Sequence, residues 1–87
     1  MKVIQIQNIL KKDIPLHYRN EYTGEVVFQA KHSDKVIKRV EFSLEKIATG
    51  GFDIQIQFQD ALDYPLIPVI KTLKEHILRM EKEGVLR

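Results

Sequence analysis

The stretch FDIQIQFQD, residues 52–60, alternates apolar and polar side chains without a break over its first eight positions. Phenylalanine and isoleucine occupy the even-numbered positions, whereas aspartate and glutamine occupy the odd-numbered ones. A period of two residues is typical of a β-strand that buries one face and leaves the other polar. The pattern therefore predicts a strand over about residues 52–59, in a sheet that is covered on one side.

The same period recurs earlier in the chain, and we expect three further strands, over about residues 2–9, 25–31 and 36–44. Gly50 and Gly51 supply the permissive backbone of a hairpin turn that leads into the quoted strand. Lys38 falls on the apolar side of its strand, which predicts a β-bulge or a position near the strand end.

Residues 11–23 show no clean period and contain Pro15, so we expect a loop there. This segment gathers residues of several chemistries, and the candidate binding residues in it are His17, Tyr18, Arg19 and Tyr22. One interpretation is a surface connection whose tyrosines cover an edge of the core. The other is a loop that binds a partner, because loops often carry binding residues.

After residue 65 the period changes to that of an amphipathic helix. Apolar residues recur at helical spacing, namely Leu66, Val69, Ile70, Leu73, Ile77 and Met80. Pro68 suits the first helical turn, and Gly84 is a natural C-terminal stop. We therefore expect a helix over about residues 66–83.

Four strands followed by one helix predict an α+β fold, a four-stranded antiparallel sheet with one C-terminal helix packed on one face. This is a β-β-β-β-α two-layer sandwich. With 87 residues, the chain is expected to form a single domain over residues 1–87.

Composition narrows the class of protein. The sequence contains no cysteine, which excludes disulfides, thiolate metal sites and a thiol nucleophile. Its N-terminus is too polar and too short for a signal peptide or a membrane span, so we expect a cytoplasmic protein with no membrane partner. The formal net charge of +2 is too mild to indicate a partner by itself.

Motifs for catalysis are missing from the sequence. The three histidines have no metal-ligand spacing, and there is no phosphate-binding loop and no nucleophile motif. Asp60 and Asp63 precede the predicted helix, where carboxylates usually cap the helix or interact with its dipole. We therefore expect no enzyme activity, no metal and no cofactor.

The sheet face that the helix leaves uncovered is the best functional clue. All six glutamines of the chain fall on that parity, together with Val27 and Ile37. A wet sheet face is the simplest interpretation. A mixture of apolar, amide and basic groups also suits a contact surface, and we expect a protein-interaction module that forms a homodimer through this face or a sheet edge.

Single-stranded nucleic-acid binding is the alternative from another class. Lys31, Lys35, Lys38 and Arg39 would contact phosphates, and Gln29, Gln55 and Gln57 would reach base edges. In the order of its elements the chain resembles the small single-strand binders of the transcription-coactivator and Whirly type. All four phenylalanines fall on the core parity, so the stacking platform usual in such proteins is missing and the interaction module is favoured.

Overall fold

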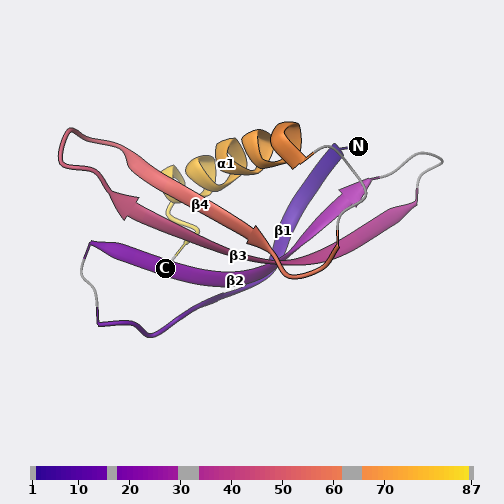
Figure 1. Cartoon of the computed structure of the whole chain (residues 1–87), viewed down its shortest axis with the longest axis horizontal. Coiled ribbons are helices and arrows are strands. Elements are labelled where there is room, and N and C mark those ends of the chain that lie inside the picture. The colour runs from indigo at the N-terminus through magenta and orange to yellow at the C-terminus, as the bar shows by residue number, and fades with distance from the viewer. Residues whose placement is uncertain (1, 16–17, 30–33, 62–65, 87) are drawn as a thin grey trace.

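The computed structural model describes residues 2–15, 18–29, 34–61 and 66–86. Its elements are strands β1 (Lys2–Lys11), β2 (Arg19–Gln29), β3 (Lys35–Lys46) and β4 (Phe52–Phe58), followed by helix α1 (Leu66–Lys82). The strands form one antiparallel sheet in the order β1-β2-β3-β4, and α1 lies against one face of it (Figure 1). The predicted α+β fold is confirmed.

The core lies between the sheet and α1. Even-numbered residues of β2, β3 and β4 point to this side, and they pack with one stripe of the helix. The largest fully buried side chains are Tyr22, Phe28, Leu73, Ile77 and Val26. Phe52, Ile56 and Phe58 of β4 are only partly buried against this cluster. The core is therefore sealed at its centre and incomplete along β4.

Helix α1 begins and ends where its sequence predicts. Pro68 lies in the first turn, where a missing N–H has no intrahelical partner to lose. At the other end Gly84 adopts a φ of 72°. Its N–H donates to the Glu81 carbonyl at 3.1 Å, and the Val85 N–H donates to the Met80 carbonyl at 3.0 Å. These two bonds form a Schellman motif, which stops the helix at Lys82, one residue before the predicted end.

The predicted loop over residues 11–23 is wrong for its second half, because β2 already begins at Arg19. Tyr22 is buried and stacks on Phe42 with 5.1 Å between ring centroids. The sequence hides this strand because Asn20 and Gly24 occupy the core-side positions on either side of Tyr22, so the apolar alternation fails. Unbroken pairing with β3 imposes the extended conformation instead.

Strand β1 is longer and less regular than the predicted strand over residues 2–9. The register with β2 shifts between Val3 and Gln5 and again between Gln7 and Leu10, where Asn8 has a φ of 52°. The first shift leaves Ile4 36% exposed while Val3 packs against the core. A β-bulge inserts one extra residue, so simple parity cannot place the side chains of this strand.

The remaining strand predictions hold in part. Gly50 and Gly51 form the β3–β4 hairpin with φ values of 100° and 83°, as predicted. Lys38 pairs with Val26 in an unbroken register, so the bulge considered for it is absent from β3, and its side chain stays on the helix side. The predicted end of the second strand, at residues 30–31, lies outside the described residues.

We predict that Leu73→Ala lowers the free energy of unfolding by roughly 2–5 kcal/mol, because its fully buried side chain would leave a cavity between helix and sheet. Urea denaturation followed by circular dichroism measures this change. Lys74→Ala, an exposed change at the next helical position, is the matched control and should shift stability by less than about 0.5 kcal/mol. Equal stability of the two variants would contradict the assigned helical phase.

Candidate interaction surfaces

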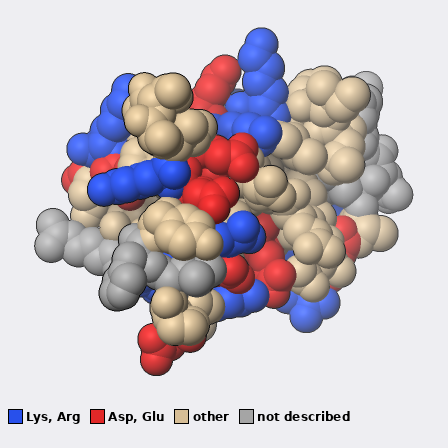
Figure 2. All heavy atoms as spheres, turned by 60° about the vertical axis from the view of Figure 1, so that its left-hand side comes forward, with Lys and Arg blue, Asp and Glu red and all other residues tan. Residues whose placement is uncertain are grey.

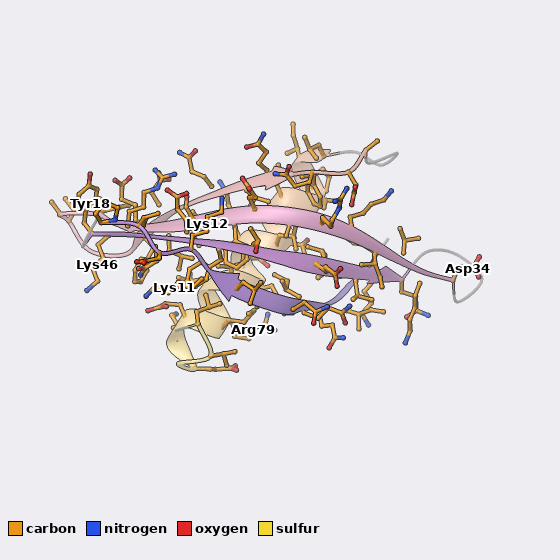
Figure 3. The ribbon with its side chains drawn as sticks, turned by 90° about the horizontal axis from the view of Figure 1, so that it is seen from below. Lys11, Lys12, Tyr18, Asp34, Lys46 and Arg79 are labelled. Atoms are coloured by element: carbon orange, nitrogen blue, oxygen red, sulfur yellow. The ribbon has the colours of Figure 1, made fainter. Side chains whose placement is uncertain are left out.

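The sheet face away from α1, called the open face here, is seen in Figure 3 with the helix behind it. Paired residues of neighbouring strands point to the same side, so the face is organised in rows. Two successive rows across β2, β3 and β4 are Glu21, Ser43, Gln55 and Thr23, Glu41, Gln57. Gln5 and Gln7 pair with odd-numbered residues of β2 and fall on the same face. The glutamines therefore gather where the alternation predicts.

A hollow of about 340 Å³ opens on this face. Ser43 lies at its floor and is 5% exposed, because its short side chain stands between longer neighbours. Gln55 and Gln57, two of the predicted binding residues, line its β4 side. The sequence analysis missed Ser43, since a serine in an alternating strand has no signal beyond its small size.

Two ion pairs border the hollow. Lys12 Nζ lies 3.0 Å from Glu41 Oε1, and Arg19 Nε lies 3.2 Å from Glu21 Oε2. Lys12 belongs to the end of the sheet opposite Asp34 (Figure 3). The charged side chains that line the hollow are two cations and two carboxylates, so they cancel formally. A balanced polar lining does not favour a phosphate or another anion.

The predicted phosphate-binding cations are not brought together. Arg39 is engaged by Asp60, which accepts hydrogen bonds from Arg39 Nη2 at 2.7 Å and from the Arg39 backbone N–H at 2.8 Å. Lys38 points to the helix side of the sheet, and Lys35 is exposed at the start of β3. Lys31 lies outside the described residues.

Asp60 corrects a second prediction, because its carboxylate binds β3 and not the start of α1. The Arg39 side-chain hydrogen bonds, followed by the Arg39 backbone hydrogen bond, lower the pKa of the Asp60 carboxyl to about 2. The same pairing raises the pKa of the Arg39 guanidinium. Asp63, the other carboxylate predicted near the helix start, lies outside the described residues.

The predicted amide residues separate into two groups. Gln55 pairs with Ser43, whereas Gln29 pairs with Lys35 at the other end of β3. Eight residues of extended strand place these two rows about 27 Å apart. The amides and the remaining cation therefore do not form one site.

The candidate loop residues also separate. Arg19 lines the hollow on the open face, whereas Tyr22 is in the core. Tyr18 is exposed just before β2, and His17 lies outside the described residues. Of the described members, Arg19 alone lines the hollow on the open face.

Charges of both signs are intermixed on the molecular surface. Figure 2 shows lysine and arginine side chains interleaved with aspartate and glutamate on the end of the molecule that it displays. On the open face, Arg39 pairs with Glu25 of β2 and is followed two positions later on its own strand by Glu41. A polyanion requires a surface dominated by one sign, and this view shows none.

A second surface lies at the outer margin of β4. A groove of about 390 Å³, called the β4 groove here, is lined by Ile56, Gln57, Phe58, Asp60, Leu66 and Ile70. Leu66 is 49% exposed and its neighbour Ile67 is 84% exposed. β4 is an edge strand of the described sheet, so apolar side chains here adjoin unpaired backbone groups. The sequence analysis assigned these residues to the core by their period and therefore missed the groove.

Two searches of the described residues complete the survey. No group of three or more histidine, aspartate or glutamate residues lies close enough to hold a metal ion, within the parts of the chain that the structure describes. No helix among the described segments is long and apolar enough to cross a membrane.

We predict that Arg39→Gln raises the pKa of Asp60 from about 2 toward the ordinary carboxyl value near 4, because the guanidinium donors are lost. Carboxyl ¹³C chemical shifts followed from pH 1.5 to 6 measure this change. Lys35→Gln, which neutralises a cation on the same strand, is the control and should leave the pKa of Asp60 unchanged.

The sign of the linked stability follows from the lowered pKa. The folded carboxyl binds its proton less tightly than the unfolded one, so the pair stabilises the fold fully above about pH 4. That contribution is lost as the pH falls toward 2. An Asp60 pKa that is the same in the wild type and in Arg39→Gln would show that the pair does not form in solution.

Comparison with known proteins identifies the family of the chain. The family model described as the BB-0187 family matches residues 1–82, and the chain belongs to this family. No curated protein matches the chain, and no solved structure does so either.

Proposed function

We propose that this member of its family is a non-catalytic protein-interaction module that works as a homodimer. The observation that carries the proposal is the β4 groove, in which exposed apolar side chains adjoin an unpaired strand edge. Contiguous apolar surface of this kind marks association sites in small soluble domains. An unpaired edge adds backbone groups that a partner strand can satisfy.

The open face supports this choice by contrast. Its charged groups already have partners within the chain, as in the pairs Lys12–Glu41 and Arg19–Glu21. Such pairs can remain solvated without cost, whereas the apolar groups of the β4 groove gain free energy when they leave water. The dimer contact is therefore assigned to β4, and the open face is left for a further protein partner.

The size of the chain supports self-association as well. A domain of 87 residues buries a modest share of its surface, and here one helix covers one sheet face. A second copy would complete the partly buried margin around Phe52, Ile56 and Phe58. We propose the cytoplasm as its compartment, because the sequence lacks the cysteines that stabilise many small secreted domains.

We predict that light scattering gives a mass about twice the 10.2 kDa of one chain at high micromolar concentration. Leu66→Glu should shift this mass toward the monomer, because a carboxylate would enter the apolar groove. The variant should still fold, since Leu66 is half-exposed and a carboxylate in the first helical turn interacts favourably with the dipole.

Val85→Glu is the matched control, because Val85 is an exposed apolar residue after the helix and does not line the groove. This variant should keep the wild-type mass. A wild-type chain that stays monomeric up to millimolar concentration would contradict the proposal. A dimer that Leu66→Glu leaves intact would move the contact away from the β4 groove.

Single-stranded nucleic-acid binding remains the alternative proposal, supported by the basic run over residues 31–39. The placement of Lys38 and the pairing of Arg39 with Asp60 weigh against a joint phosphate site. We therefore expect no saturable binding of labelled oligonucleotides in fluorescence anisotropy at about 0.15 M salt. Saturable binding that Lys35→Gln together with Lys38→Gln weakens would favour the alternative.

A further inference from the structure

The hydrogen bonds of the β3–β4 hairpin reveal which backbone groups of β4 face outward. The Gln59 N–H donates to the Arg39 carbonyl at 2.9 Å, and the Ile47 N–H donates to the Gly51 carbonyl at 3.2 Å. In an antiparallel pair, bonded and non-bonded residues alternate, so the odd-numbered residues of β4 bond to β3. The even-numbered residues therefore direct their N–H and C=O groups to the free edge: Phe52, Ile54, Ile56 and Phe58.

The sequence of β4 reads almost the same in both directions. FDIQIQF has phenylalanine at both ends, isoleucine on either side of the central Gln55, and the two directions differ only at Asp53 and Gln57. An antiparallel copy of such a strand meets itself residue for residue. This is the self-complementarity that a two-fold dimer interface requires.

We infer that two copies pair β4 to β4, antiparallel, about a two-fold axis at Gln55, and build one continuous eight-stranded sheet. The inference rests on the proposed homodimer and specifies its contact. In this register Phe52 lies opposite Phe58 of the second copy, Ile54 opposite Ile56, and Asp53 opposite Gln57. The outward-facing residues pair with one another, which gives about eight backbone hydrogen bonds between the copies.

Other registers use the strand less well. A shift by one residue pairs odd with even positions, so outward-facing groups meet groups already committed to β3 and the two side-chain faces are exchanged. Axes at Ile54 or Ile56 place an end of the strand opposite Gly50 of the hairpin turn or opposite Asp60, outside β4. An axis at Asp53 sets two carboxylates face to face, which is destabilising.

The β4 groove agrees with this register. Phe58 lines the groove, and Phe52 of the second copy lies directly opposite Phe58 on the same side of the sheet. The ring of that Phe52 is thereby brought to the groove walls formed by Leu66 and Ile70. Three half-buried residues of each β4 would then share one apolar layer across the axis: Phe52, Ile56 and Phe58.

The other edge of the sheet is not suited to the same contact. β1 has two register shifts, and Asn8 has a left-handed φ of 52° in the second of them. Irregularities of this kind blunt an edge against further pairing. Pairing through β4 alone closes after two copies, whereas alternate pairing of β1 with β4 would build an open fibre.

Cysteine cross-linking tests the register directly, because the chain has no cysteine of its own. We expect Gln55→Cys to form a covalent dimer rapidly under mild oxidation, since the two residues face each other across the axis within disulfide reach. Gln57→Cys and Asp53→Cys should each fail alone, because four residues of strand separate the like positions by about 14 Å. An equimolar mixture of these two variants should cross-link.

A charge variant gives a second readout that does not need oxidation. Gln55→Glu places two carboxylates opposite each other, so the dimer dissociation constant should rise about two- to fivefold. Gln5→Glu adds the same charge to the open face at β1 and should leave the constant unchanged. Analytical ultracentrifugation measures both.

The outcomes separate the register from the homodimer. Suppose the chain is dimeric by mass, but Gln57→Cys or Asp53→Cys cross-links alone and Gln55→Cys does not. That result would overturn the β4 register and leave the homodimer standing, whereas a chain that is monomeric by mass would overturn both. A dissociation constant that rises equally in Gln55→Glu and Gln5→Glu would also count against the axis at Gln55.

Discussion

One amphipathic helix covers one face of a longer four-stranded sheet, and most other features follow from this mismatch. The 17 residues of α1 span about 25 Å, whereas the 12 residues of β3 span about 40 Å. Packing of α1 seals the sheet centre, where Phe28 and Leu73 are fully buried. The margin along β4 receives less cover, so its phenylalanines remain partly exposed to water.

Two surfaces of different chemistry result. The open face is polar and largely satisfied within the chain, because cations such as Lys12 and Arg39 bond to neighbouring carboxylates. The β4 margin is apolar and unsatisfied, because it combines half-buried side chains with outward-facing backbone groups. Burial of the second surface gains more free energy than contact at the first, so association is expected at β4.

Local patterns predicted the elements that local forces determine, namely the regular strands, the glycine hairpin and the stripe of α1. They failed where tertiary pairing decides. Pairing with β3 makes an extended strand of residues 19–24, although Asn20 and Gly24 interrupt its apolar alternation. Arg39 is held by Asp60, 21 residues away, and no local spacing connects them. Parity also could not separate the fully buried Phe42 from the half-buried Phe58.

The central claim, that a second copy occupies the β4 edge, is tested most directly by amide hydrogen exchange of β4 at low and high protein concentration. The odd-numbered amides bond to β3 and should be protected at both concentrations. The account predicts that the amides of Phe52, Ile54, Ile56 and Phe58 exchange rapidly in the dilute sample and become protected in the concentrated one. Rapid exchange of these four amides at every concentration would contradict it.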